Sequence, residues 1–246
     1  MSFLAVIATL AFAAASSSSG NPVIGALRAT VPLPAVRLSP PPPKVAGPSF
    51  PIATVLPGHR IALRTSPGGR VLERVGDRTE FGSIRVYWIR RVQGPWFGVL
   101  TPDLPNGQLA WIRDDRLALG VSQTPFWITA DVSRERLTLH YGNRILTSFP
   151  VSVGSPGSPT PLGDYSVTDG LVGRGLGPWY GCCVLALSGH QPHLPAGWIG
   201  GDRIAIHGTP STIGGAKSAG CLEASDPNMI SLFARVPLGT PVFIRA

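Results

Sequence analysis

The sequence is poor in charged residues and has no basic run, and both features limit the function classes that remain. Asp, Glu, Lys and Arg make up only 14% of the 246 residues, although the net charge is +8. A basic chain can bind nucleic acid, an anionic membrane surface or an anionic polymer. The arginines stand singly or in pairs, as Arg90 and Arg91 do, and no basic run is interleaved with aromatic residues. This pattern argues against nucleic-acid binding; it is compatible with an anionic cell-wall polymer but does not select one.

Long helical patterns are also missing. No stretch carries a sustained heptad or a long amphipathic repeat, whereas 30 glycines and 26 prolines favour short strands and many turns. Hydrophobic residues account for 43% of the chain, and its length suffices for two modest domains with cores of their own. We therefore expect a mainly β protein.

Cysteine is scarce. The chain has only Cys182, Cys183 and Cys221, an odd number with two adjacent members and no zinc-type CxxC spacing. This does not predict a disulfide framework, and at least one thiol is expected to be free. We expect Cys182 and Cys183 to pack within a Gly-rich segment, or to pair with another thiol on export. Cys221 is either a nucleophile or a buried inert thiol.

The N-terminus carries an export pattern. An unbroken apolar run over Phe3–Ala15 is followed by small residues and a serine tract, which resembles a secretory signal peptide. No Lys or Arg precedes the run, so an uncleaved N-terminal anchor is the alternative. The run is shorter than the roughly 20 residues of a membrane-spanning helix, which favours cleavage. We expect residues 1–20 to direct export to the cell wall, periplasm or exterior, with membrane contact only through such an anchor. Residues 21–52 are Pro- and Ser-rich and predict an extended linker.

Residues 53–120 predict a first small β domain. About five short stretches of strand-forming residues are separated by turns such as Ser66–Gly69 and Asn106–Gly107. The stretches GPWFGVL, PNGQLAWI and RLAL resemble the small bacterial Src-homology-type (SH3-like) barrels found beside wall enzymes. The resemblance implies a wall-associated module. A structural spacer that binds nothing is the alternative.

Residues 124–246 predict a second β-rich domain. Residues 126–153 indicate three strands separated by turns, and the Gly-rich residues 170–201 indicate a flap over a site. Residues 226–236 are the one convincing helix. Ser225 or Asp226 can cap it, Pro227 suits its first turn, and Ile230, Phe233 and Ala234 form its apolar stripe.

The candidate reactive centre is the stretch IAIHGTPSTIGGAKSAGCLEA. His207 ends a predicted strand, and Cys221 follows fourteen positions later, directly after Ser218, Ala219 and Gly220. A thiol is largely un-ionised at neutral pH and needs a neighbouring group to accept its proton, which an imidazole can do. Gly220 leaves the peptide at Cys221 free to direct an N–H group at a developing oxyanion. The spacing therefore allows a Cys/His acyl-transfer centre.

A family resemblance rests on the order of five stretches. They are ADVSRERLTLHYGNRILTSFPVSVG, TPLGDYSV, IAIHGTP, SAGCL and LGTPVFI. This order resembles the YkuD-type L,D-transpeptidase catalytic domain over nearly all of residues 125–246. The resemblance implies that Cys221 is the acylated nucleophile and His207 its proton acceptor. It implies that Gly208, Ser218 and Gly220 orient His207 or build the oxyanion pocket.

The same resemblance implies a fold and a reaction. The fold is a β-sandwich with one or two short helices. The enzyme would form a Cys thioester on a peptidoglycan tetrapeptide stem and pass the acyl group to an amine of a neighbouring stem. No metal or organic cofactor is expected, and carbapenem-type β-lactams are expected covalent inhibitors. Tyr180 and Thr209 are expected to line the substrate site.

Three positions depart from the family pattern and keep alternatives open. Ala219 replaces a frequent His, and Leu222 and Glu223 stand where an Arg often follows the Cys. That Arg would help to hold a carboxylate, so Glu223 reverses the charge. The alternatives are an L,D-carboxypeptidase that uses water as acceptor, or a degenerate wall-binding protein. A papain-like peptidase places its Cys before its His, which is the opposite order.

Overall fold

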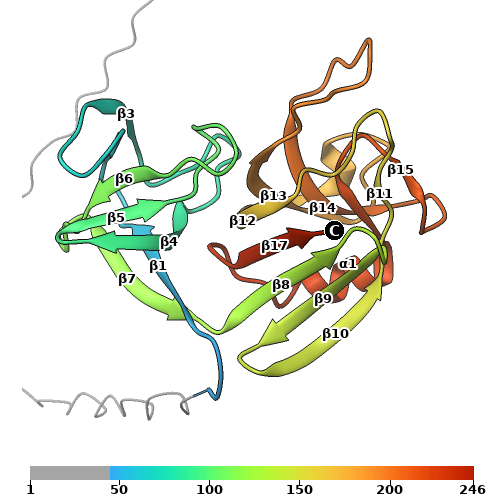
Figure 1. Cartoon of the computed structure of the whole chain (residues 1–246), viewed down its shortest axis with the longest axis horizontal. Coiled ribbons are helices and arrows are strands. Elements are labelled where there is room, and N and C mark those ends of the chain that lie inside the picture. The colour runs from blue at the N-terminus through green and yellow to red at the C-terminus, as the bar shows by residue number, and fades with distance from the viewer. Residues whose placement is uncertain (1–44) are drawn as a thin grey trace, which may run out of the picture. The chain divides into compact units, whose positions relative to one another are not determined.

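The computed structural model describes residues 45–246 (Figure 1). The predicted export segment and residues 21–44 of the predicted linker lie outside the described residues. The described residues belong to one compact unit. Among the described residues, no helix is long and apolar enough to cross a membrane. Strands dominate, which confirms the mainly β prediction.

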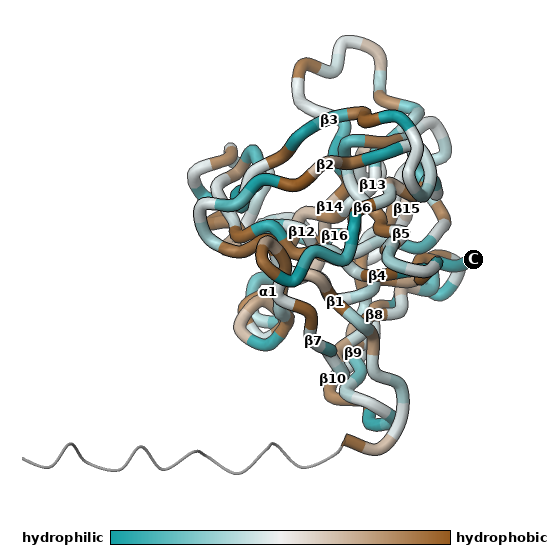
Figure 2. Tube along the Cα trace, turned by 90° about the vertical axis from the view of Figure 1, so that its left-hand side faces the viewer, coloured by the Kyte–Doolittle hydropathy of each residue, from teal (hydrophilic) through white to brown (hydrophobic). Residues whose placement is uncertain are grey.

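The first part of the chain forms a seven-stranded sheet with the order β3-β2-β6-β5-β4-β1-β7. Its strands are β1 (Phe50–Val55), β2 (Ile61–Arg64), β3 (Val71–Val75), β4 (Val86–Gln93), β5 (Trp96–Val99), β6 (Ala110–Arg113) and β7 (Leu119–Thr124). Along β2, Ile61 and Leu63 are buried while Ala62 and Arg64 are half-buried, and Figure 2 shows the mixed hydropathy of this strand. The sheet has seven strands where the sequence predicted about five, and it encloses its own apolar cluster.

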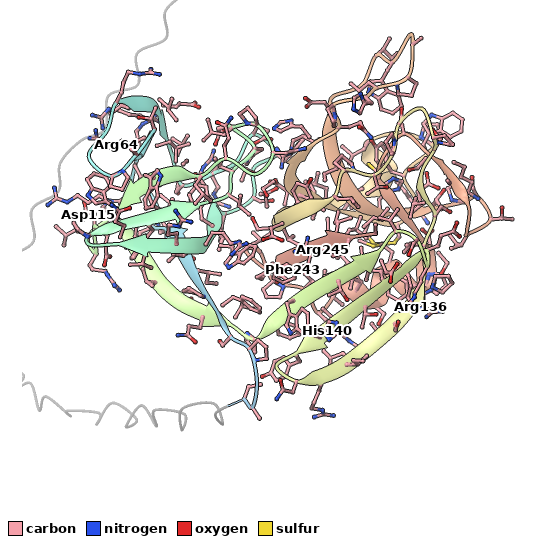
Figure 3. All side chains as sticks on the ribbon, viewed as in Figure 1. Arg64, Asp115, Arg136, His140, Phe243 and Arg245 are labelled. Carbon is pink, nitrogen blue, oxygen red and sulfur yellow. A yellow bond between two sulfur atoms is a disulfide. The ribbon has the colours of Figure 1, made fainter. Side chains whose placement is uncertain are left out.

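The predicted linker ends earlier than residue 52, because β1 already begins at Phe50. The Phe50 ring lies 5.9 Å from Trp88, 6.0 Å from Phe243 and 6.4 Å from Trp127, measured between ring centroids. Figure 3 labels Phe243 and its neighbour Arg245 on β17. Aromatic packing of Phe50 thus extends the strand into the segment that its prolines had marked as linker.

The second part contains an eight-stranded sheet with the order β10-β9-β8-β17-β12-β13-β14-β16, a two-stranded sheet of β11 and β15, and one α-helix. Its strands are β8 (Phe126–Asp131), β9 (Arg136–Tyr141), β10 (Arg144–Pro150), β11 (Val153–Gly154), β12 (Gly163–Val172), β13 (Cys183–His190), β14 (Arg203–Thr209), β15 (Ala216–Ser218), β16 (Leu222–Ser225) and β17 (Pro241–Arg245). β12 is shared: residues 163–166 pair with β17, and residues 167–172 pair with β13. A second apolar cluster is formed by residues of this part.

The predicted flap over residues 170–201 is wrong at its centre. Cys183–His190 form the interior strand β13, between β12 and β14, and its first seven residues are buried. A strand covered on both faces is apolar throughout, so it lacks the alternation that reveals a half-exposed strand. What remains of the flap is two loops, residues 173–182 with the short 3-10 turn η1 (Gly173–Gly175), and residues 191–202.

The predicted helix exists as α1 (Asp226–Phe233), with Pro227 in its first turn. The predicted apolar stripe is wrong: Met229 and Leu232 are fully buried, whereas Ile230 is 55% exposed. Met229 and Leu232 are three positions apart and share one helix face, and Ile230 lies off that face. Ser225 precedes the helix without a side-chain capping bond.

Candidate active site

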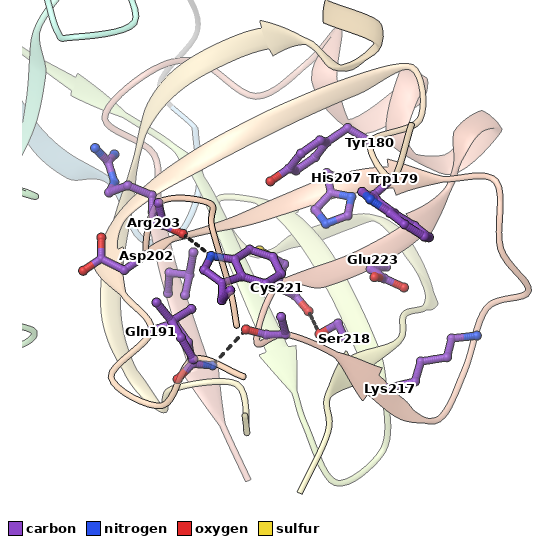
Figure 4. A pocket seen from close by; sticks show the side chains of 15 residues that line it. Trp179, Tyr180, Gln191, Asp202, Arg203, His207, Lys217, Ser218, Cys221 and Glu223 are labelled. Atoms are coloured by element: carbon purple, nitrogen blue, oxygen red, sulfur yellow. Dashed lines mark hydrogen bonds between the residues drawn. The ribbon is translucent and has the colours of Figure 1, made fainter. Parts of the chain in front are cut away.

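His207 and Cys221 line one cavity of about 300 Å³ (Figure 4). Both loops that flank β13 contribute to its wall. The first loop provides Trp179 and Tyr180, and the second provides Gln191, Leu194, Trp198, Gly201 and Asp202. The remaining wall consists of Arg203, Ile204, Lys217, Ser218, Ala219 and Glu223. The reactive pair predicted from the sequence therefore lies in a pocket with an aromatic rim.

Strand register explains how the two residues meet. β14 and β16 pair in parallel, with His207 opposite Glu223. Leu222 and Ala224 point into the core, where they are 1% and 0% exposed. Because side chains alternate along a strand, Cys221 and Glu223 fall on the other face, the face that carries His207.

The His207 ring is held in one orientation. Its Nδ1 lies 2.7 Å from the carbonyl oxygen of Gly208, and since a carbonyl only accepts, Nδ1 carries the proton. In the neutral ring Nε2 is then the free acceptor. Burial lowers the pKa of His207, while the Gly208 hydrogen bond acts in the opposite direction. The Tyr180 ring packs edge-on against the imidazole at 4.9 Å between centroids.

Cys221 is the free cysteine of the described chain. The pKa of its thiol is raised to about 11, chiefly by burial and to a smaller extent by the charge of Glu223, while a backbone hydrogen bond from Ala205 acts in the opposite direction. With an ordinary thiol near 8.5 as reference, Cys221 is protonated at neutral pH. The resting pair is therefore a neutral thiol and a neutral imidazole.

The turn before Cys221 is fixed by Ser218. The Ser218 hydroxyl donates to the Cys221 carbonyl at 2.6 Å and accepts the Gly220 N–H at 3.1 Å. Gly220 has a φ of +112°, and a Cβ there would overlap the Gln191 amide nitrogen. The position thus needs glycine for its backbone conformation and for its space. Within residues 45–246 the hydrogen bonds of the Ser218 hydroxyl go to Gly220 and Cys221 and not to His207. Ser218 therefore holds the turn before Cys221 and does not orient the imidazole.

Two residues that the sequence did not place near the site hold its surrounding segments together. The buried Gln191 amide donates to the carbonyls of Ala219 (3.2 Å) and Pro159 (3.0 Å), and so ties the nucleophile turn to the loop before β12. The Asp226 carboxylate accepts the Cys182 N–H at 2.9 Å. All three hydrogen bonds join residues 28 or more positions apart, and no local signal in the sequence marks them.

Thr209 does not line the cavity, contrary to the prediction. It ends β14 and is 8% exposed. A Cβ at Gly181 would lie 2.7 Å from the carbonyl carbon of Gly208 and 2.8 Å from the Thr209 nitrogen. The Tyr180–Gly181 segment therefore lies against this end of β14, and Tyr180 takes the place in the wall.

Cys182 and Cys183 form a disulfide with each other. Both residues also pack against the core, as predicted, and Cys183 is 6% exposed. The sequence analysis did not foresee that two adjacent cysteines would bond to each other. The bridge stands at the start of β13, next to Gly181. Among the described residues, no group of three or more His, Cys, Asp or Glu side chains is arranged to hold a metal ion.

Comparisons with known proteins bear on the second part of the chain. Residues 125–244 match the sequence model of the YkuD L,D-transpeptidase catalytic domain. Over 122 residues the chain is 33% identical to "Putative L,D-transpeptidase YkuD" of Bacillus subtilis and 31% identical to the protein of the same name from Bacillus licheniformis. Each match covers 49% of this chain and 66% of the relative.

A solved structure, the "L,D-transpeptidase from Mycobacterium smegmatis", aligns with a TM-score of 0.41 at 18% identity. That alignment covers 66% of this chain and 90% of the other. The family assignment rests on the sequence matches. Residues 125–244 are accordingly an L,D-transpeptidase catalytic domain of the YkuD type.

Proposed function

We propose that this protein is a peptidoglycan L,D-transpeptidase that works through a thioester on Cys221. One observation carries the proposal. His207 shares a cavity with Cys221, and the Gly208 carbonyl holds its Nδ1 proton, which leaves Nε2 as a proton acceptor. The match to the YkuD L,D-transpeptidase catalytic domain supports this class of reaction, and the donor in our proposal is a tetrapeptide stem.

In the first half-reaction the Cys221 sulfur attacks the carbonyl between an L-centre and a D-amino acid of the donor stem. Because thiol and imidazole are both neutral at rest, the thiol proton passes to His207 Nε2 as the bond forms. The peptide N–H of Cys221, at the end of the turn that Ser218 fixes, is the proposed donor for the developing oxyanion. The imidazolium then protonates the leaving amine, and a D-amino acid departs from the thioester.

In the second half-reaction an amine of a neighbouring stem attacks the thioester carbonyl. His207 takes one proton from the attacking nitrogen and returns it to the departing Cys221 sulfur. The products are a new peptide bond and the regenerated thiol. Water in place of the amine gives an L,D-carboxypeptidase on the same stem. A degenerate wall-binding protein is disfavoured, because the nucleophile, the acceptor nitrogen and the turn glycine are all present.

The test is an assay of purified protein with a synthetic tetrapeptide stem that ends in D-alanine, with and without an amine acceptor. Mass spectrometry is expected to show D-alanine release, an acyl-enzyme on Cys221 and a cross-linked product. Cys221→Ala should abolish all three. D-alanine release without cross-linked product at any acceptor concentration would establish the carboxypeptidase instead. No acylation by stem or β-lactam would overturn the proposal.

We also propose that the protein is exported and that carbapenems inhibit it. The apolar run at Phe3–Ala15 supports export to the compartment that holds peptidoglycan, and residues 53–120 would act as an SH3-like wall-associated module. Carbapenems are expected to acylate Cys221, since their strained amide carbonyl is an acyl donor. One aligned structure is described as LdtMt1 in complex with imipenem, which is a property of that protein. Fractionation of cells that express the full chain tests the export proposal.

A further inference from the structure

A carboxylate stands beside the reactive pair. Glu223 lies two positions after Cys221, faces His207 across the β14–β16 pairing and lines the same cavity. Figure 4 shows its side chain beneath the ring of His207. A group attached to a stem peptide that reacts at Cys221 must therefore pass close to this charge.

The Glu223 side chain has no partner within the described residues. Across residues 45–246 it makes neither a side-chain hydrogen bond nor an ion pair within 4 Å. Glu223 is half-buried; burial raises the pKa of its carboxyl group, and the charge of Lys217 lowers it. The Lys217 ammonium is itself engaged by the carbonyl oxygen of Thr212 and, at 3.3 Å, by its hydroxyl. A partly desolvated carboxylate without a partner gains from a cation that binds next to it.

Asp202 and Arg203, two other charged side chains of the cavity wall, already have side-chain partners. The Asp202 carboxylate lies 2.9 Å from Nδ1 of His190. The Arg203 guanidinium donates to the carbonyl of Leu187 at 2.7 Å and pairs with Glu80. Neither is free to bind an incoming charge, and the Lys217 ammonium is held by the oxygens of Thr212, so Glu223 is the charged side chain of this cavity wall that has no hydrogen-bonding partner among residues 45–246.

We propose that the Glu223 carboxylate binds a primary ammonium group of the stem peptide and makes the enzyme selective for stems that carry one. The inference rests on the proposed transpeptidase function. It assigns to Glu223 a substrate-binding role opposite in sign to that of an arginine at the same position. The ammonium can come from the side chain of the donor residue that forms the thioester, or from the acceptor stem.

Binding of a cation at Glu223 also acts on the thiol. The Glu223 charge raises the pKa of Cys221, after the larger effect of burial. A bound ammonium cancels that charge, so a cationic donor favours ionisation of its own nucleophile. An acceptor ammonium loses one proton to solvent before its nitrogen attacks; its second proton passes through His207 to the departing sulfur.

The donor experiment compares two synthetic stems that differ only at the third residue, lysine or Nε-acetyl-lysine. D-alanine release is measured with water as the sole acceptor. Wild type is expected to have a kcat/KM for the lysine stem higher by on the order of tenfold, the effect of one partly desolvated charge pair. In Glu223→Gln the ratio should fall to about one.

The acceptor experiment uses the acetyl-lysine stem as donor and adds either the lysine stem or its acetylated form as acceptor. If the ammonium belongs to the acceptor, Glu223→Gln lowers the ratio of cross-link to hydrolysis with the lysine acceptor, and the donor ratio of wild type is already near one. Asp202→Asn is the matched control. It removes another carboxylate of the same cavity, one that is already paired, and should preserve the wild-type preference in both experiments.

A penem without a cationic group separates this inference from the proposed function. It should acylate Cys221 in wild type, and faster in Glu223→Gln because the loss of the neighbouring charge lowers the thiol pKa. A wild type that accepts the penem and the stems but shows no preference in either experiment overturns the inference alone. A preference that survives in Glu223→Gln does the same. Failure of wild type to react with the penem and both stems overturns the proposed function and this inference with it.

Discussion

The backbone N–H of Gly181 donates a 2.7 Å hydrogen bond to the carbonyl oxygen of Gly208. The same oxygen accepts the Nδ1 proton of His207 at 2.7 Å. One carbonyl therefore connects the loop before β13 to the orientation of the proposed proton acceptor. The loop also brings Tyr180 against the imidazole. Its position should matter for the reactivity of Cys221, although Gly181 itself does not line the cavity.

Gly181→Ala is expected to slow acylation of Cys221 by a penem and to destabilise the fold. The new Cβ would overlap the Asp226 carboxylate and lie 2.7 Å from the Gly208 carbonyl carbon, so the loop must shift. Overpacking of this kind costs about 1–3 kcal/mol. Stopped-flow acylation and urea unfolding measure the two effects.

The matched control is Gly175→Ala, in the same loop, where a Cβ would meet nothing within 4 Å and φ is not positive. It should leave both the acylation rate and the free energy of unfolding close to wild type. Equal behaviour of the two variants would show that the Gly181–Gly208 contact does not position His207.

The pH dependence of Cys221 alkylation should reveal a protonated resting thiol. Burial raises its pKa to about 11, so the rate with iodoacetamide should rise about tenfold per pH unit from neutral pH and level off only near pH 11. Glu223→Gln should move the curve to lower pH. A plateau already reached near pH 7 would instead indicate a thiolate–imidazolium pair at rest, which the lowered pKa of His207 disfavours.

That His207 and Cys221 share one cavity could be predicted from the sequence because the signals for it are local. His207 directly follows the strong strand-formers of residues 204–206 and lies near the end of β14, and the glycines before Cys221 mark a tight turn. The residues that hold the surrounding segments in place could not be predicted, because their contacts are distant in the sequence. Gln191 reaches Pro159 and Ala219, and Asp226 reaches Cys182, across spans of 28 to 44 positions. Such contacts exist only once the strands have assembled, so no window of sequence contains them.

In the fold, too, features with local sequence signals could be predicted and features that depend on packing could not. The mainly β class followed from glycine, proline and strand-forming residues, and the position of α1 followed from Pro227 and its polar start. The buried face of α1 could not be predicted, because Met229 and Ile230 are both apolar. Only the packing of the helix against the core decides that Met229 is buried and Ile230 exposed. β13 was missed because an interior strand, apolar on both faces, looks like any buried apolar segment when it is set among glycines.

The Cys182–Cys183 disulfide predicts a simple thiol count. Unfolding in denaturant with an alkylating agent but no reductant should label one cysteine, Cys221, and prior reduction should allow three labels. Intact mass spectrometry reads the number, and peptide mapping reads the site. Three labels without reduction in protein purified under oxidising conditions would contradict the bridge.

A buried carboxylate between the two sheets leads to the last prediction. Asp169 of β12 is fully buried. One of its oxygens accepts the Thr79 hydroxyl from the connection between β3 and β4, while the other has no hydrogen-bond partner in the part of the chain that the structure describes. The Arg203 guanidinium, 3.8 Å away, compensates its charge. Arg203→Met should leave that charge uncompensated and lower the free energy of unfolding by about 3–5 kcal/mol.

Urea unfolding followed by tryptophan fluorescence measures this loss. Arg134→Met is the control, since Arg134 pairs with Asp131 at 3.7 Å through a side chain that is 80% exposed, and water screens such a pair. The double variant Arg203→Met/Asp169→Leu removes both charges and should recover much of the stability, because no unpaired charge then remains buried. If the double variant is as unstable as Arg203→Met, the loss comes from the other contacts of the guanidinium, to Leu187 and Glu80, and not from Asp169.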